Sequence, residues 1–249
     1  MEINILNLRI WQKERINIMK EILPKLGDNY VLKGGTALMF FYNLDRFSED
    51  IDLDAKHSVS KIENLLKPLI KQKNWKYNVT KNTDTVFRIM IDYGAVNNLG
   101  KYPLKIEVSG RNKNLLNANV LSINNINNIN VYNLKELSKM KVIAFSQRDK
   151  IRDFYDIAFL LDKNDKLFTN DQLYEIKTIM EYKDLEVLAM YLDKEFSENC
   201  LKKINSEDFV LQTYLKLDKL LITRNKEISN FKEKPKLNLS KPIGKGLER

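Results

Sequence analysis

The stretch that decides the fold is Lys33-Gly-Gly-Thr-Ala-Leu-Met-Phe-Phe-Tyr-Asn-Leu-Asp-Arg46-Phe-Ser-Glu-Asp50-Ile-Asp-Leu-Asp54. The apolar run at residues 30–33 predicts a short strand, which the two glycines end. Thr36 opens a helix that we expect to reach about residue 44. Charged and apolar residues alternate from residue 50 to residue 54, which predicts a strand with one solvated face.

The same stretch carries the groups of a phosphate and metal site. A strand, two glycines and a helix leave backbone N–H groups free at Gly34, Gly35 and Thr36, where phosphate oxygens bind well. Asp50 and Asp52 lie two apart on a strand, so both carboxylates face one side and can hold paired Mg²⁺ ions. A Ca²⁺ loop is excluded because its sixth position holds alanine and its twelfth holds lysine. A Walker loop is excluded because no Gly-Lys-Ser/Thr follows the glycines.

A two-metal site usually needs a third carboxylate, and two residues compete for that role. Glu107 lies within the apolar strand pattern Leu-Lys-Ile-Glu-Val of residues 104–108, and Lys105 shares its face by the period of two. Asp92 lies in the similar pattern of residues 89–93. We prefer Glu107 for its denser apolar flanks and its neighbouring lysine, while Asp92 stays an alternative.

A second charged group lies between Lys141 and Asp156 and has a helical pattern. Arg152 and Asp156 are i, i+4 neighbours, as are Arg148 and Arg152, and like charges stacked on one helix face favour contact with an anion. This pattern indicates a phosphate-binding face. The alternative is a pair of helices joined by Arg–Asp ion pairs, each worth about 0–1 kcal/mol if exposed.

The rest of the chain predicts an α+β protein in which a mixed sheet precedes helices. We expect helices over residues 8–26 and 58–73, strands over 75–80, 85–93 and 102–109, and a loop-rich segment with one short strand over 112–133. Helical periodicity then predicts helices over residues 134–145, 149–162, 170–181, 183–197 and 207–224. We therefore divide the chain into a mixed-sheet domain (1–133), a helical domain (134–229) and a basic tail (230–249).

Composition narrows the chemistry available to the 249 residues. The single cysteine, Cys200, excludes an intrachain disulfide, and together with the single histidine, His57, it leaves too few ligands for a His/Cys zinc site. No Gly-x-Ser-x-Gly sequence accompanies His57. The longest apolar run is too short to span a membrane, and no signal peptide is visible, so we expect a cytoplasmic protein.

The formal charge of +9 and the isoelectric point of about 9.3 make nucleic acid a natural partner. The same composition, rich in Lys, Asn and Ile, is equally explained by a biased genome.

Together, the motifs at residues 33–38 and 46–53 and the late group Lys141, Arg148, Asp153 and Asp156 resemble the DNA polymerase beta-like nucleotidyltransferases. Within this superfamily the chain looks closest to the AbiEii/AbiGii abortive-infection toxins. The resemblance covers roughly residues 30–160 and implies a mixed-sheet nucleotidyltransferase domain with a helical domain behind it.

The resemblance implies a role for each matched residue. Asp50, Asp52 and Glu107 would bind Mg²⁺ or Mn²⁺, and Glu107 could also serve as the base for the acceptor hydroxyl. An NTP would be held by Lys33, Gly34, Gly35, Thr36 and Lys105, with Lys141 and Arg148 on its phosphates and Asp153 or Asp156 orienting these groups.

The implied reaction is attack of an acceptor hydroxyl on the α-phosphate, with release of pyrophosphate. Members of the family act as toxins of bacterial toxin–antitoxin pairs, and some are tRNA nucleotidyltransferases. The resemblance therefore implies RNA, with tRNA first, as the acceptor and an antitoxin as a partner. The alternatives are transfer to a protein or a small molecule, and a non-catalytic basic RNA-binding module.

Overall fold

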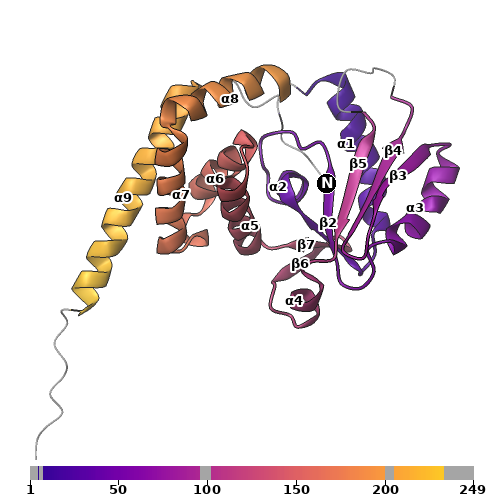
Figure 1. The fold of residues 1–249 in the computed structure, drawn as a ribbon, viewed down its shortest axis with the longest axis horizontal. Helices are drawn as coiled ribbons and strands as arrows, with labels where there is room; N and C mark the ends of the chain where they lie inside the picture. The colour runs from indigo at the N-terminus through magenta and orange to yellow at the C-terminus, as the bar shows by residue number, and fades with distance from the viewer. Residues whose placement is uncertain (1–4, 6–7, 96–101, 200–204, 233–249) are drawn as a thin grey trace, which may run out of the picture.

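A seven-stranded mixed sheet and a set of helices that follow it in sequence lie side by side in the computed structural model (Figure 1). The structure describes residues 5, 8–95, 102–199 and 205–232. No described helix has the length and apolar character needed to cross a bilayer.

The sheet has the strand order β3-β4-β5-β2-β1-β7-β6. Strands β2 and β5 are parallel, as are β1 and β7, whereas β1–β2, β3–β4, β4–β5 and β6–β7 are antiparallel pairs. The strands are β1 (Tyr30–Lys33), β2 (Ile51–Ala55), β3 (Lys76–Asn82), β4 (Val86–Asp92), β5 (Leu104–Ser109), β6 (Ile123–Ile126) and β7 (Ile129–Tyr132).

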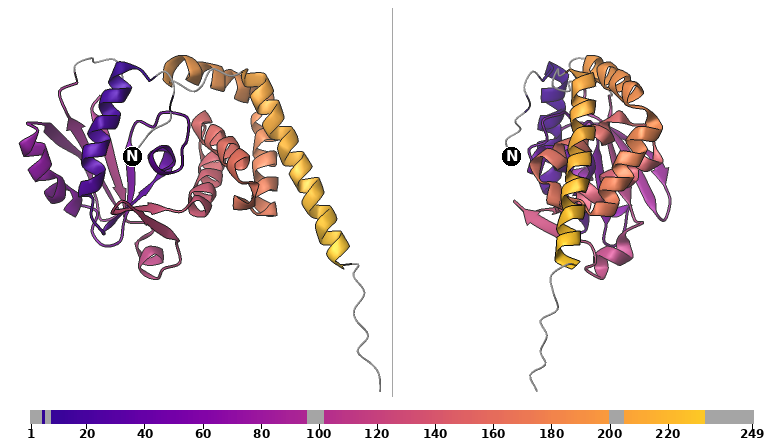
Figure 2. Two further views of the ribbon diagram at one scale, coloured as in Figure 1. Left: turned by 180° about the vertical axis from the view of Figure 1, so that it is seen from behind. Right: turned by 90° about the vertical axis from the view of Figure 1, so that its left-hand side faces the viewer.

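Helices flank the sheet on two sides. Helices α1 (Ile10–Ile22) and α3 (Lys61–Gln72) lie on the side away from the C-terminal helices (Figures 1 and 2). Apolar side chains of both helices are buried in the sheet core, as the amphipathic patterns require. A 3₁₀ turn, Leu23–Lys25, follows α1, and α2 (Gly34–Phe41) begins directly at the end of β1.

The helical part begins where the periodicity of the sequence changes. Asn133 caps α5 by accepting a hydrogen bond from the Glu136 N–H, and Thr169 and Gln172 form a capping box on α7. The helices are α5 (Leu134–Gln147), α6 (Ile151–Lys163), the 3₁₀ turn Asp165–Leu167, α7 (Asn170–Lys183), α8 (Leu185–Asn199) and α9 (Ser206–Lys232).

The segment of residues 112–133 is more ordered than the sequence predicts. It contains α4 (Lys113–Asn117) and the hairpin β6–β7, and β7 adds to the main sheet parallel to β1. Asn127 and Asn128 have φ values of 53° and 62°, which a two-residue hairpin turn with positive φ requires. Strand β7 is buried at all four residues, so it lacks the alternation that marks a half-buried strand.

The other elements follow the predicted order with shifted ends. Helix α9 extends through Asn230–Lys232, into the predicted tail, while residues 233–249 and Cys200 lie outside the described residues. The division into domains at residue 134 stays a prediction, although α5 begins there.

Candidate active site

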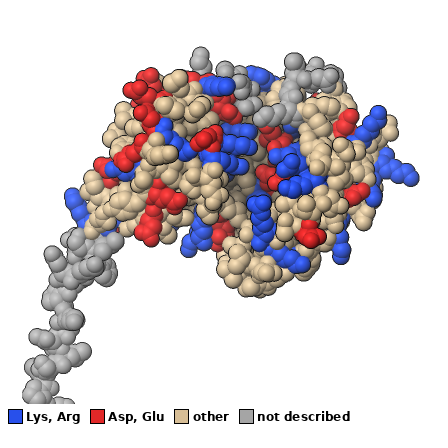
Figure 3. Space-filling view, viewed as in Figure 1, with Lys and Arg blue, Asp and Glu red and all other residues tan. Residues whose placement is uncertain are grey.

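A charged cleft of about 290 Å³ lies between the acidic strands of the sheet and the connection from α5 to α6. Figure 3 shows basic and acidic side chains gathered around the hollow in the middle of this face. The cleft is lined by Gly35, Arg46, Ser48, Glu49, Asp50, Asp52, Arg88, Lys105, Glu107, Lys141, Arg148, Lys150, Arg152 and Asp153.

Three carboxylates meet on the sheet side of the cleft. Asp50 directly precedes β2 and Asp52 lies within it, and the parallel register pairs Asp52 with Glu107 of β5. Burial raises the pKa of Asp52, and the nearby carboxylates of Asp50 and Glu107 raise it further, against the opposing charge of Lys105. The structure thus places the three predicted acids side by side.

Basic side chains neutralise two of these acids. Lys105 Nζ lies 2.8 Å from Asp50 Oδ2, and Arg88 holds Glu107 Oε2 through Nε at 2.7 Å and Nη2 at 2.6 Å. Burial opposes ionisation of Glu107, yet the Arg88 contacts lower its pKa overall. Burial also opposes the charge on Lys105, but Asp50 raises the pKa of this lysine overall.

Asp92, the alternative third acid, does not line the described cleft. Its Oδ1 accepts a hydrogen bond from the Gly94 N–H at 3.0 Å, beyond the end of the β4–β5 pairing. Arg88, four residues earlier on β4, is the residue opposite Glu107. The register therefore sets Glu107, and not Asp92, next to Asp52.

The two glycines allow close packing behind the acids. Gly34 has a φ of +73°, and a Cβ there would lie 3.2 Å from Asp52 Oδ2. A Cβ on Gly35 would lie 2.8 Å from both Arg46 Nη2 and Ser48 Oγ, closer than real side chains approach. Only glycine fits at residue 35 without displacing these two groups.

Thr36 holds the segment between α2 and β2 in place. Its buried hydroxyl donates to the Asp50 carbonyl oxygen and lies 2.9 Å from Ser48 Oγ. Lys33 faces the same side of the sheet as Asp52, but its Nζ pairs with Asp54 Oδ1 at 2.5 Å. Both residues therefore support the cleft from behind, and the described cleft lining does not include them.

The strand over residues 50–54 was expected to have one solvated face, but its third acid, Asp54, is fully buried. It accepts hydrogen bonds from Asn112 Nδ2 at 2.7 Å and from the Tyr132 hydroxyl at 2.8 Å, besides its pair with Lys33. Addition of β7 to the sheet brings Tyr132 there, so the face that the sequence predicts as solvated is closed at this end of β2.

The helical wall of the cleft is built on a buried network of charges. Arg46 donates from Nε and Nη2 to the two carboxylate oxygens of Asp156, each at 2.6 Å. Lys141 Nζ lies 2.6 Å from Asp156 and 2.8 Å from Asp153, and Arg148 Nε lies 2.7 Å from Asp153. Although burial opposes ionisation, Lys141 and Arg148 lower the pKa of Asp153 to about 2.

The predicted stack of Arg148 and Arg152 on one helix face is wrong. Helix α5 ends at Gln147 and α6 begins at Ile151, so Arg148 lies in an extended connection, with a φ of −151°. Arg152 also does not pair with Asp156. It lies 3.0 Å from Glu195 of α8 and 3.8 Å from Glu49.

The sequence alone suggested no individual role for four charged residues that line the cleft: Arg46, Glu49, Arg88 and Lys150. For Arg88 a signal existed, since it interrupts the apolar pattern of β4 on the face shared with Glu107. The predicted site residues that do line the cleft are Gly35, Asp50, Asp52, Lys105, Glu107, Lys141, Arg148 and Asp153, while Lys33, Gly34, Thr36 and Asp156 do not.

As the side chains lie, no group of three His, Cys, Asp or Glu among the described residues is arranged to hold a metal ion. The donor chemistry nevertheless fits Mg²⁺, which binds carboxylate oxygens and retains waters. Asp50, Asp52 and Glu107 present such oxygens on one face, and two of them already hold cationic partners in Lys105 and Arg88.

The sequence also matches the model of a known protein family. A family model described as nucleotidyl transferase AbiEii toxin, type IV toxin–antitoxin system, matches residues 17–223. The chain belongs to the AbiEii toxin family. Membership in this family supports nucleotidyl transfer from an NTP by a toxin of a toxin–antitoxin system, and it implies an antitoxin partner.

Two solved structures share the AbiEii-type fold of the chain. JHP933 from Helicobacter pylori is 25% identical and has a TM-score of 0.73, over 91% of this chain and 100% of its own. A second H. pylori structure, named as a candidate nucleotidyltransferase, is 24% identical, with a TM-score of 0.74 over 88% of this chain and 99% of its own. A comparison with curated protein sequences gave no match.

Proposed function

We propose that the protein is an Mg²⁺-dependent nucleotidyltransferase toxin that transfers a nucleotide from an NTP to RNA, with tRNA as the first candidate. The observation that carries the proposal is the arrangement of Asp50, Asp52 and Glu107 opposite a basic helical wall. Mn²⁺ would suit the same oxygen ligands. A reaction that consumes NTP and cellular RNA takes place in the cytoplasm.

The three acids would hold the metal, which supplies charge neutralisation of the phosphates and activation of the acceptor hydroxyl. Although burial opposes ionisation, the Arg88 contacts lower the pKa of Glu107, so its carboxylate is available as an oxygen ligand. Lys105 and Arg88 would turn from the acids towards the negative phosphates. Gly35, at the start of α2, lines the cleft, and the N–H groups of a helix N-terminus are suited to phosphate oxygens.

Lys150 adds a phosphate ligand that the sequence did not reveal. Among the described basic residues that line the cleft, it is the one for which no carboxylate partner is found. Burial lowers the pKa of Lys150, and the neighbouring charges of Arg148 and Arg152 lower it further. A bound polyphosphate would relieve this repulsion, so we assign Lys150, with Lys141 and Arg148, to the phosphates.

The positively charged chain is suited to an RNA acceptor, because Lys and Arg that neutralise phosphates supply most of the affinity for nucleic acids. Asp153 and Asp156 would hold the basic groups in place, since both are buried and paired with them. Asp156 thus acts through Arg46 and Lys141.

The test is labelling of total bacterial RNA by the purified full chain with Mg²⁺ and each α-³²P-labelled NTP in turn, resolved on a denaturing gel. We expect a labelled band at tRNA size that disappears with Asp52→Asn and with Glu107→Gln. Asp92→Asn, which removes a carboxylate outside the cleft, is the matched control and should keep the label.

Three other outcomes would contradict the metal site, the RNA acceptor or the catalytic activity in turn. Label that persists in Asp52→Asn would refute the metal site. Label on added protein or on a small molecule, but not on RNA, would change the acceptor. Binding of RNA with no transfer to any acceptor would leave a non-catalytic RNA-binding module.

A further inference from the structure

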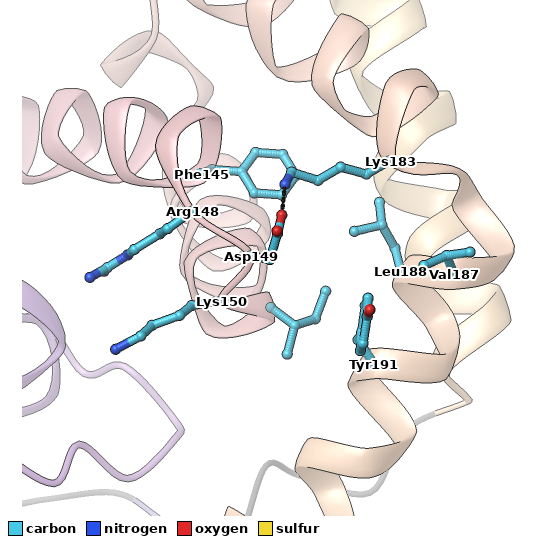
Figure 4. Close-up of a pocket in the computed structure, with 9 residues that line it drawn as sticks. Phe145, Arg148, Asp149, Lys150, Lys183, Val187, Leu188 and Tyr191 are labelled. Carbon is cyan, nitrogen blue, oxygen red and sulfur yellow. Dashed lines mark hydrogen bonds and ion pairs between the residues drawn. The ribbon is translucent and has the colours of Figure 1, made fainter.

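A second pocket lies in the helical part, on the other side of the connection that carries Arg148 and Lys150 (Figure 4). Its volume is about 220 Å³, below the roughly 300–1,000 Å³ of pockets that take drug-sized ligands. Such a volume suits a single ring system. Besides the connection itself, Phe145 of α5, Lys183 of α7 and Val187, Leu188 and Tyr191 of α8 line it.

The connection between α5 and α6 gives alternate side chains to the two hollows. Arg148 and Lys150 both have extended backbone angles, so successive side chains point to opposite sides. In Figure 4, Arg148 and Lys150 point away from the pocket, while Asp149 points towards Lys183 on its far wall. Arg148 and Lys150 also line the charged cleft, so one strip of chain is the shared wall of both sites.

The pocket combines apolar walls with one ion pair. Phe145 and Leu188 are buried, whereas Tyr191 is 52% exposed. Lys183 pairs with Asp149, and its Nζ lies 5.7 Å from the centroid of the Phe145 ring. A flat ligand with an apolar face and hydrogen-bonding edges matches these walls, and a nucleobase has both features.

Helix α8 joins the pocket to the cleft. Glu195 of α8 contacts Arg152, which lines the cleft, with 3.0 Å between Oε1 and Nε. Tyr191 precedes Glu195 by four residues, about 6 Å along the helix axis. The exposed tyrosine ring therefore lies about one helical turn from the rim of the cleft.

We propose that this pocket binds an unpaired base of the acceptor RNA, which stacks on Tyr191 while the backbone of the same strand crosses the connection towards the cleft. This inference rests on the proposed function and specifies how its acceptor is recognised. Protein sites for single-stranded RNA combine a basic track for the backbone with aromatic rings for the bases. Tyr191 supplies the aromatic ring on one side of the connection, and the basic residues of the cleft lie on the other side.

A strand fits this arrangement better than the base of the NTP. The basic side chains that would take the triphosphate point into the cleft, and the pocket opens on the other side of the connection (Figure 4). A single nucleotide would have to wrap around the connection to fill both sites. A strand extends over several nucleotides, so it can hold one base in the pocket while a neighbouring nucleotide presents its hydroxyl in the cleft.

The test compares Tyr191→Ala, Tyr191→Phe and the control Tyr182→Ala in the full chain. Tyr182 is 89% exposed on α7 and does not line the pocket. Affinity for a short fluorescein-labelled single-stranded RNA is measured by anisotropy, and KM for total tRNA and KM for NTP are measured separately. We expect Tyr191→Ala to weaken RNA binding and to raise the KM for tRNA, each about tenfold, with the KM for NTP unchanged. Tyr191→Phe and Tyr182→Ala should stay within about twofold of the parent.

The outcomes separate this inference from the proposed function. If Tyr191→Ala raises the KM for NTP and not for tRNA, the pocket binds the donor base and the inference is wrong. If the variant changes neither KM nor the RNA affinity, the pocket takes no part in substrate binding. If the parent protein transfers no nucleotide to RNA, the proposed function fails, and a parent that also binds no single-stranded RNA refutes the pocket assignment independently.

Discussion

The contact between Asp156 of α6 and Arg46, in the segment before β2, allows the most direct test of how the helices are held against the sheet. The carboxylate is fully buried and accepts two hydrogen bonds from Arg46 and one from Lys141, all at 2.6 Å. The substitution Asp156→Leu keeps a side chain of similar size and removes the charge. It leaves the Arg46 guanidinium buried without its main partner, while Lys141 keeps Asp153 at 2.8 Å.

Removing one member of a buried ion pair typically costs about 3–5 kcal/mol, because the remaining charge stays buried and unpaired. The total unfolding free energy of a protein is about 5–15 kcal/mol, so Asp156→Leu should be marginally stable. Replacing both partners, as in Arg46→Met with Asp156→Leu, is often nearly neutral. We therefore expect the double variant to recover at least about 2 kcal/mol of the loss.

The assay is urea unfolding of the full chain, followed by circular dichroism, on all four proteins of this double-mutant cycle. Asp162→Leu is the matched control, because Asp162 lies on the same helix and pairs with Lys216 while its side chain is 71% exposed. That exposed pair should contribute at most about 1 kcal/mol. A loss for Asp156→Leu no larger than that of the control would refute the reasoning, as would losses in the double variant that simply add.

Further variants and conditions test the remaining features. The pKa of Asp153 is lowered to about 2 in the folded chain, so its contribution of roughly 2 kcal/mol is present above about pH 4 and is lost as the pH falls through 2. Urea midpoints should fall over this range, and less steeply in Asp153→Asn. Gly35→Ala should displace Arg46 or Ser48. It should lower the unfolding free energy by about 1–3 kcal/mol, as measured by urea unfolding, and it should also lower transfer activity in the labelling assay. Lys150→Ala should raise the KM for NTP about tenfold, and Lys150→Arg should restore it, whereas equal KM values in all three proteins would remove Lys150 from the phosphate site.

Local signals in the sequence predicted the acidic strand and its neighbours. The spacing of Asp50 and Asp52 fixes their shared side, and the apolar flanks of Glu107 identify a buried strand next to them. The parallel register that aligns Asp52 with Glu107 is a long-range property. The sequence could therefore name the acids, but it left Asp92 as an alternative.

The features of the structure that the sequence did not predict are contacts between distant segments and unusual backbone conformations. Arg46 and Asp156 are 110 residues apart, and nothing near either residue indicates the other. The sequence predicts two helices that end and begin near Arg148, but no glycine or proline marks the extended connection there, so the i, i+4 spacing of Arg148 and Arg152 wrongly suggests one helix face. The turn at Asn127 and Asn128 lies within an asparagine-rich repeat, which hides the two positions that take positive φ.

The separation of Arg46 from Asp156 also sets the order of events during synthesis of the chain. At roughly 5–20 residues per second, about 5–20 s pass between translation of the guanidinium and translation of its carboxylate. Until then the glycine-rich motif and the acidic strand have emerged without the helices that neutralise Arg46. We expect a chain that ends before α6 to show no transfer activity in the labelling assay, so a toxin of this design would become active only late in its own translation.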